Sequence, residues 1–153
     1  MTSRPTLRKA TVEKALIYCI QDHELLVFSH PDFPAEEVGI QVPGGTVRPG
    51  EPAETAAGRE LAEETGREDF EIVRLIGSAD YDVSPYGPEI HHRRFFQARP
   101  KVRWPERWIS WERHDGRGEP TRFEFFWLPL ARAHVLQAGQ GALISELAAL
   151  LDL

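Results

Sequence analysis

Short apolar runs between turn-forming residues predict a chain rich in β-strands. Aliphatic, aromatic and β-branched side chains gather in these runs, as strands require. In the last run, the alternation of Phe123, Phe125 and Trp127 indicates one buried face, with Phe126 on the other. The strands predicted from this pattern are residues 9–20, 24–29, 38–42, 71–78, 90–98 and 122–128.

Helical spacing occurs in two segments. Ala53, Ala56, Ala57 and Leu61 form an apolar stripe between Pro52, which suits a first helical turn, and Gly66, a good C-terminal stop. A second amphipathic helix is predicted over residues 141–151, whereas residues 100–121 are expected to be irregular. The order of strands, helix, strands and helix predicts an α+β chain, or a layered α/β/α sandwich with a mixed sheet.

Length and composition predict a single globular domain over residues 1–153. The sequence has 41% hydrophobic residues and no apolar run near the ~18 residues that a membrane span needs. Neither a leader-like apolar segment nor a basic block occurs, and Cys19 is the only cysteine, placed in an apolar run. We therefore expect a cytoplasmic protein with a buried Cys19, no membrane association and no nucleic-acid partner.

The net charge of −6 is concentrated in one segment. Residues 51–71 contain eight acidic and two basic residues, which accounts for the whole excess of 24 acidic over 18 basic residues. Within it, Glu60, Glu63 and Glu64 have the spacing that places three carboxylates on one helix face. Three negative charges on one face repel one another. The segment is therefore either an ordinary solvated acidic helix or a site for a divalent cation, for which oxygen ligands suit Mg²⁺ or Mn²⁺.

The residues around these carboxylates resemble the Nudix box, G-x5-E-x7-R-E-U-x-E-E-x-G-U, in which U is aliphatic. Gly45, Glu51 and the segment from Arg59 to Gly66 supply all seven fixed letters, and Leu61 supplies the first U. Arg67 stands at the last U, a departure at a position that usually anchors the turn after the helix. The chain thus resembles the Nudix hydrolase family, and the resemblance implies the Nudix fold.

The resemblance also implies an activity and a set of site residues. Nudix enzymes hydrolyse a nucleoside diphosphate linked to another moiety, with Mg²⁺ or Mn²⁺. By resemblance, Glu60, Glu63, Glu64 and the Gly44 carbonyl hold the metal, and Arg59 braces the carboxylates. The general base is either Glu60 or a later carboxylate, for which the candidates are Glu89, Glu112, Glu119 and Glu124. Of these we favour Glu119, which lies in a loop just before the last strand.

Substrate binding is predicted on the strand over residues 90–98. Alternation places His92 and Arg94 on one face and His91 and Arg93 on the other, and arginine on the site-facing side suits phosphate oxygens. We expect Arg94, His92 and Arg93 to contribute, although solvent exposure of these charges is an equal alternative. Three indoles could stack on a base or, more commonly, pack a loop onto the sheet: Trp104, Trp108 and Trp111.

Three functions are compatible with these motifs. The first is a hydrolase whose small-molecule substrate is a nucleoside triphosphate, a nucleotide sugar or a dinucleotide. The second is a Nudix-fold module that binds a nucleotide without cleaving it, although such modules usually lose box carboxylates. The third is a prenyl diphosphate isomerase, which needs a cysteine in the pocket, whereas Cys19 is predicted to be in the core. A homodimer is possible, as in many family members.

Overall fold

The computed structural model describes residues 9–33, 39–84, 87–112 and 118–153. Long strands and one long helix dominate this part of the chain. The elements are β1 (Ala10–Gln21), β2 (Glu24–Ser29), β3 (Gly44–Thr46), α2 (Ala53–Thr65), β4 (Phe70–Asp82), β5 (Glu89–Pro100), β6 (Arg107–Glu112), β7 (Thr121–Pro129), the 3₁₀ helix η2 (Leu130–Val135) and α3 (Ile144–Leu150).

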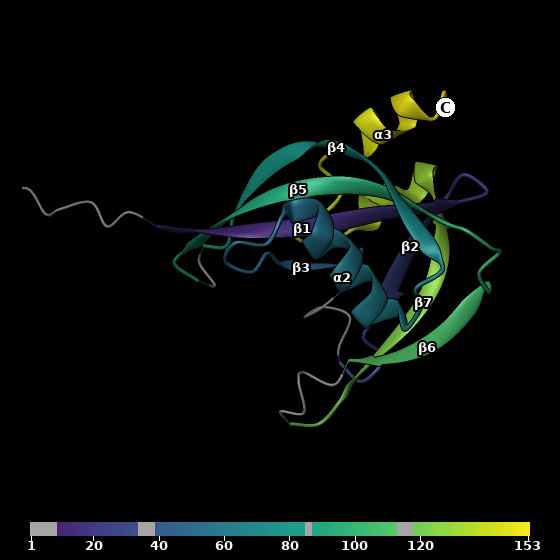
Figure 1. Cartoon of the computed structure of the whole chain (residues 1–153), viewed down its shortest axis with the longest axis horizontal. Helices are drawn as coiled ribbons and strands as arrows, with labels where there is room; N and C mark the ends of the chain where they lie inside the picture. The colour runs from purple at the N-terminus through teal and green to yellow at the C-terminus, as the bar shows by residue number, and fades with distance from the viewer. Residues whose placement is uncertain (1–8, 34–38, 85–86, 113–117) are drawn as a thin grey trace, which may run out of the picture.

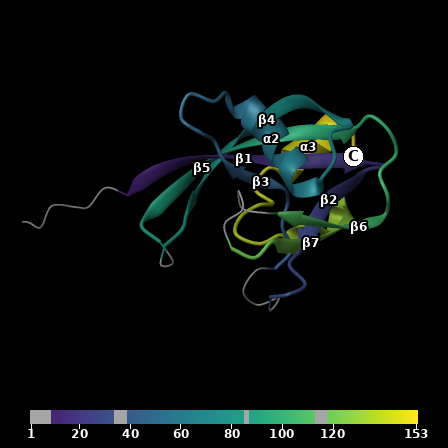
Figure 2. The same ribbon diagram turned by 60° about the horizontal axis from the view of Figure 1, so that its bottom comes forward.

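The strands of the described residues form one mixed sheet of seven strands in the order β4-β5-β1-β2-β7-β6, with β3 beside β1. β1 and β5 are parallel, and the other strand pairs are antiparallel. Helix α2 lies against β1 and β5, and α3 lies beyond the opposite side of these strands (Figure 1). Turning the molecule shows β2, β7 and β6 as a second wing of the sheet (Figure 2). The predicted α/β/α arrangement with a mixed central sheet is confirmed.

Strand β1 is buried on both faces and therefore joins two hydrophobic cores. Ala15, Ile17 and Cys19 pack with α2 and the wing of β2 and β7, whereas Leu16 and Tyr18 pack toward η2 and α3. This explains why the run is apolar at every position rather than at alternate ones. Cys19 is fully buried, as predicted.

Helix α2 begins and ends where the local sequence predicts. Pro52 precedes the first helical residue in an extended conformation, and Gly66 ends the helix with a φ of 73°, donating its N–H to the Ala62 carbonyl. That left-handed conformation suits glycine because a Cβ atom is disfavoured there. The buried face carries Ala56, Ala57 and Leu61, and also Glu60 and Glu64.

Three differences from the predicted elements concern the residues around the helix. Residues 100–121 are not all irregular, because β6 forms in that segment and pairs with β7. The strand predicted over 38–42 is absent in its described part, where Ile40 and Gln41 make only isolated bridges. Instead, the glycine-rich segment forms β3, which is held by hydrogen bonding to β1 rather than by any apolar pattern.

Tryptophans fasten the C-terminal end of α2 to the sheet. Trp108 donates its indole N–H to the Thr65 carbonyl at 3.0 Å and stacks on Phe125, and Trp104 donates to Asp69 at 3.0 Å. Packing, rather than base stacking, is therefore the role of Trp104 and Trp108. Arg67 pairs with Asp69 and lies over the Trp104 ring at 5.3 Å, so a cation–π contact replaces the usual aliphatic anchor at this position.

The structure predicts a large difference between two indoles of this segment. Trp104 is 1% exposed and Trp111 is 53% exposed. Trp104→Ala is expected to lower the free energy of unfolding by about 3–5 kcal/mol, because it leaves a cavity beneath α2. Trp111→Ala, the matched control, should change it by less than about 0.5 kcal/mol. Urea unfolding followed by circular dichroism measures both, and equal effects would contradict this packing.

Candidate metal centre and substrate cavity

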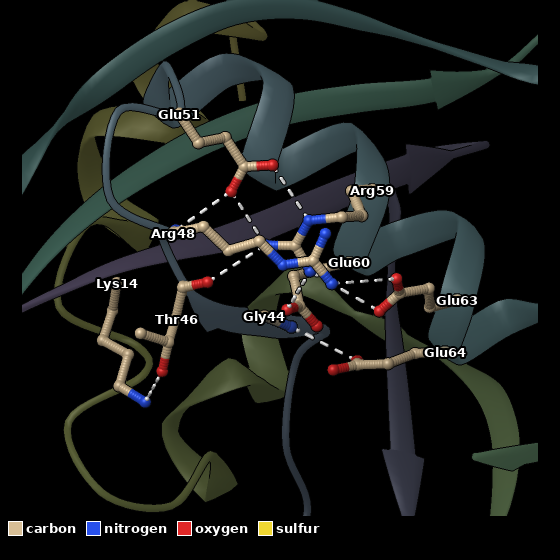
Figure 3. A network of polar contacts seen from close by, with 9 residues as sticks. All are labelled: Lys14, Gly44, Thr46, Arg48, Glu51, Arg59, Glu60, Glu63 and Glu64. Atoms are coloured by element: carbon tan, nitrogen blue, oxygen red, sulfur yellow. Dashed lines mark hydrogen bonds and ion pairs between the residues drawn. The ribbon is translucent and has the colours of Figure 1, made fainter. Parts of the chain in front are cut away.

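The Arg59 guanidinium organises the acidic face of α2 (Figure 3). Its Nε and Nη2 donate to both oxygens of Glu51 at 2.9 Å, and Nη2 also donates to the Thr46 carbonyl at 3.0 Å. Its Nη1 donates to Glu60 at 2.7 Å and lies 3.5 Å from Glu63. One cation thus touches three carboxylates and the backbone of β3, which fixes the helix against that strand.

The carboxylates of this face have different environments. Hydrogen bonds from Arg59 and from the Arg48 N–H lower the pKa of Glu51 to about 2. Burial raises the pKa of Glu60 despite the Arg59 contact, and it raises that of Glu64 well above the ordinary value. Neighbouring negative charges, including Glu112, add to both shifts, because each disfavours a further charge. Glu63 lies at the exposed edge of the group.

Two glycines allow β3 to approach these carboxylates. A Cβ atom on Gly45 would lie 2.2 Å from the carboxyl carbon of Glu60, so any other residue there would displace that side chain. A Cβ atom on Gly44 would lie 2.7 Å from the Ala15 carbonyl, so this position is closed as well. The Gly44 N–H donates a hydrogen bond of 3.3 Å to the buried Glu64 carboxylate.

The donor set suits a hard divalent cation. Glu60 and Glu64 are 9% and 5% exposed and approach one another without an intervening lysine, so their charges are only partly balanced by Arg59. Oxygen ligands of this kind are those that Mg²⁺ and Mn²⁺ prefer. As the side chains lie in the structure, no three His, Cys, Asp or Glu residues among those described converge on a single point. The fit therefore rests on the chemistry and the burial of the carboxylates.

A cavity of about 470 Å³ opens beside this acidic group. Glu64 and Glu112 border it at one side, and the backbone of Gly44 and Gly45 lies next to them. Aromatic side chains line its other walls, and these are Phe28, Tyr81, Phe123 and the imidazoles of His30 and His91. Two cationic side chains, Lys14 and Arg93, line it as well. A ligand in this cavity would contact the carboxylates and the cations together.

The residues predicted to bind substrate separate onto the two faces of β5. Arg93 lines the cavity together with His91, which the sequence did not favour. Arg94 instead pairs with Glu13 at 2.9 Å, and His92 contacts Asp80 at 2.7 Å; neither is among the residues lining the cavity. Substrate binding by Arg94 and His92 thus stays a prediction without structural support. Strand alternation divides the β5 side chains into two sets but does not show which set binds a ligand. The position of the cavity shows that the set with His91 and Arg93 faces it.

Of the four downstream carboxylates proposed from the sequence, Glu112 is the one that lines the cavity. Glu112 ends β6 with its side chain facing the cavity, and its charge acts on Glu60 and Glu64. Glu119 is exposed, and it is not among the cavity residues. The alternation of Trp108, Ser110 and Glu112 on one face of β6 is the signal that would have identified Glu112.

This geometry agrees with the comparison with known families. The model of the NUDIX domain matches residues 11–147, which is most of the chain. The chain belongs to the Nudix family. The resemblance inferred from the box is therefore confirmed, and it extends over the sheet, the carboxylate helix and the cavity together.

Solved structures show the same Nudix fold. A MutT NUDIX hydrolase from Burkholderia pseudomallei is 23% identical with a TM-score of 0.61, covering 89% of this chain and 97% of its own. A NUDIX hydrolase from Nitrosomonas europaea is 20% identical with a TM-score of 0.67, covering 90% and 88%. The MutT protein from Methanosarcina mazei is 15% identical with a TM-score of 0.67, covering 97% and 100%.

The comparison with curated proteins gave no match. Within the described residues, every helix is too short or too polar to cross a membrane.

Burial of Glu64 predicts that this side chain destabilises the metal-free protein. Because its folded pKa is raised above the unfolded one, the cost is absent at pH 4 and grows as the pH rises toward neutrality. Glu64→Gln should therefore stabilise the protein at pH 8 in EDTA, because the neutral amide removes the buried negative charge.

The matched control is Glu54→Gln, an exposed carboxylate on the same helix. It should leave the free energy of unfolding within about 0.5 kcal/mol of the wild type at either pH. Thermal and urea unfolding at pH 4 and pH 8 measure the difference. A Glu64→Gln protein that is no more stable at pH 8, or equally stabilised at pH 4, would refute a buried charge at this position.

Proposed function

We propose that this Nudix protein is a metal-dependent hydrolase that cleaves the diphosphate linkage of a nucleoside diphosphate joined to another moiety. The observation that carries the proposal is the pair of buried carboxylates Glu60 and Glu64 beside a cavity of ligand size. Arg59 holds Glu60, and the Gly44 N–H donates to Glu64. A purely structural helix would not place such charges in a low-dielectric position. The solved neighbours from Burkholderia pseudomallei and Nitrosomonas europaea are NUDIX hydrolases, which supports the same reaction class.

In this proposal Glu60, Glu63, Glu64 and the Gly44 carbonyl hold Mg²⁺ or Mn²⁺. When bound, the ion supplies a Lewis acid for the diphosphate and lowers the pKa of a coordinated water. Arg59 keeps the Glu60 carboxylate oriented through a 2.7 Å hydrogen bond and also restrains Glu51. The absence of a side chain at Gly45 lets β3 lie close to the Glu60 carboxylate.

The proton of the attacking water needs a carboxylate acceptor at the same place. Glu60 is one candidate because burial raises its pKa, which makes the carboxylate a stronger base. Glu112 is the second, because it borders the cavity next to Glu64. Glu119, the residue favoured on sequence grounds, remains a prediction, since it is exposed outside the cavity.

The direct test is an assay of nucleoside triphosphates, nucleotide sugars and dinucleotides with Mg²⁺ or Mn²⁺, with the products identified. Wild-type protein should release a nucleoside monophosphate or an equivalent phosphate product, and EDTA should stop the reaction. Glu63→Gln and Glu64→Gln should each lower kcat by at least about 100-fold, because metal ligation is lost. Glu112→Gln should lower kcat by more than Glu119→Gln does.

The control for these variants is Glu54→Gln, which should retain wild-type turnover. Near-normal hydrolysis by both Glu63→Gln and Glu64→Gln would overturn the assignment of the metal site. Tight nucleotide binding without product, in either metal, would instead identify a binding module of the same fold.

Four broader predictions accompany this function. We propose one domain over residues 1–153, of which the family match spans 11–147. We also propose a cytoplasmic location and small-molecule partners rather than nucleic acid or membrane. A homodimer remains a prediction from the family alone, and gel filtration with light scattering would test it.

A further inference from the structure

The floor of the cavity carries two cations on neighbouring strands. Lys14 on β1 is paired in register with Arg93 on β5, and also with Thr46 on β3. Neighbouring strands lie about 4.8 Å apart, so the two cationic side chains leave the sheet side by side on one face. Like charges at such a position repel one another and would normally be separated or neutralised.

Neither cation is neutralised by an ion pair within the described part of the chain. Lys14 donates to the neutral Thr46 hydroxyl at 2.7 Å, and Arg93 donates Nη1 to the Ala138 carbonyl. The other β5 arginines differ, since Arg94 pairs with Glu13 and Arg99 pairs with Glu71. The unpaired arginine of this strand is therefore the one that faces the cavity.

Arg93 is buried, and part of its guanidinium lacks a partner. The residue is 6% exposed, and its Nε has no hydrogen-bond partner in the structure. Burial lowers the pKa of Arg93, and burial also lowers that of Lys14, although Glu89 and Glu60 act in the opposite direction on the lysine. An unsatisfied buried donor of this kind is costly unless a ligand completes it.

The surroundings hold Arg93 in a fixed orientation. Its guanidinium lies 4.3 Å from the centre of the Tyr81 ring, and the chain at Ala138 and Gly139 has positive φ angles of 52° and 70°. A Cβ atom on Gly139 would come within 3.1 Å of Tyr81, so the loop packs tightly against this pair. A left-handed alanine is a strained conformation, which is retained here where its carbonyl accepts from Arg93.

We propose that Lys14 and Arg93 bind a phosphate group of the substrate that is additional to the diphosphate being cleaved. This inference rests on the proposed hydrolase function and narrows its substrate class. Two adjacent positive charges are balanced by a dianion, which a terminal phosphate provides near neutral pH. A diphosphate bridge carries one charge on each phosphate, and a nucleobase carries none. Arginine supplies the planar donors and lysine the point charge that phosphate groups accept.

The position of the cations is compatible with a ligand that also reaches the carboxylates. In Figure 3, Lys14 lies at the Thr46 end of β3, and the carboxylates of Glu63 and Glu64 lie near its Gly44 end. The cavity connects Glu64 with Lys14 and Arg93. Two sources of the extra phosphate fit this chemistry, the terminal phosphate of a nucleoside triphosphate and a phosphate on the ribose of a dinucleotide.

Matched substrate pairs test the proposal. One pair is a nucleoside triphosphate and the nucleoside diphosphate sugar with the same base, and the other is a dinucleotide with and without a ribose phosphate. The wild type should have the higher kcat/KM for the phosphorylated member of at least one pair, which identifies the source. Arg93→Gln and Lys14→Gln should lower that kcat/KM by about 10- to 100-fold and alter the other member much less.

The matched control is Arg99→Gln, which changes an exposed arginine of the same strand. It should leave kcat/KM unchanged for both members of each substrate pair. Arg93→Lys should recover part of the loss, because the charge returns without the planar donors. If Arg93→Gln fails to fold, Lys14→Gln carries the test, since Lys14 is only half-buried. An equal loss for both members of each pair, or no loss, would overturn the proposal.

A binding measurement separates this inference from the hydrolase proposal. Inorganic pyrophosphate is titrated into metal-free protein in EDTA by calorimetry, where no turnover is required. Wild type and Arg99→Gln should bind pyrophosphate with the same Kd. The Kd of Arg93→Gln and of Lys14→Gln should be at least 10-fold higher. Loss of binding in these variants supports the phosphate site even if no hydrolysis is found. Equal Kd values in all four proteins refute it even if hydrolysis is strong.

Discussion

The site depends on the hydrogen bonds and ion pairs that the Arg59 guanidinium makes. This cation joins Glu51, Glu60 and Glu63 to the backbone of Thr46, so it connects the helix, its preceding loop and β3. Without it, the carboxylates of α2 would repel one another in a partly buried position. With it, they are held together, yet the burial of Glu60 and Glu64 still raises their pKa values.

The rest of the fold is arranged around these contacts. The close approach of β3 requires Gly45, because a larger residue would occupy the space of Glu60. The far end of α2 is held by Trp108 and by the pair of Trp104 with Asp69. A helix that is fixed at both ends loses little freedom when a ligand binds, which favours a preorganised site.

The sequence predicted the parts of the site that lie on one regular element. The spacing of Glu60, Glu63 and Glu64 defines a helix face regardless of the tertiary structure, and Gly66 ends the helix as expected. It did not predict β6, where the usual pattern is inverted. There Ile109 and Trp111 point outward, whereas Ser110 and Glu112 point inward. A strand with polar residues on its inner face is not predicted when apolar alternation is used to identify strands.

Substrate contacts were the least predictable part, because they depend on which sheet face is hollow. Periodicity divided the β5 side chains correctly into two sets, but it could not show that the cavity lies beside Arg93 rather than Arg94. Nor could the sequence show that Lys14, about 80 residues earlier, lies beside Arg93, since that pairing is a parallel contact between distant strands. Both the pairing and the cavity are properties of the tertiary structure.

The most direct test of the metal site is Mn²⁺ binding, measured by electron paramagnetic resonance of the free ion. Wild-type protein should bind Mn²⁺ stoichiometrically with micromolar to millimolar affinity, and Glu64→Gln should weaken that affinity by at least about 10-fold. Glu54→Gln should bind as the wild type does. Equal Mn²⁺ affinity in the wild type and Glu64→Gln, or no binding by the wild type, would contradict the assignment of these buried carboxylates to a divalent cation.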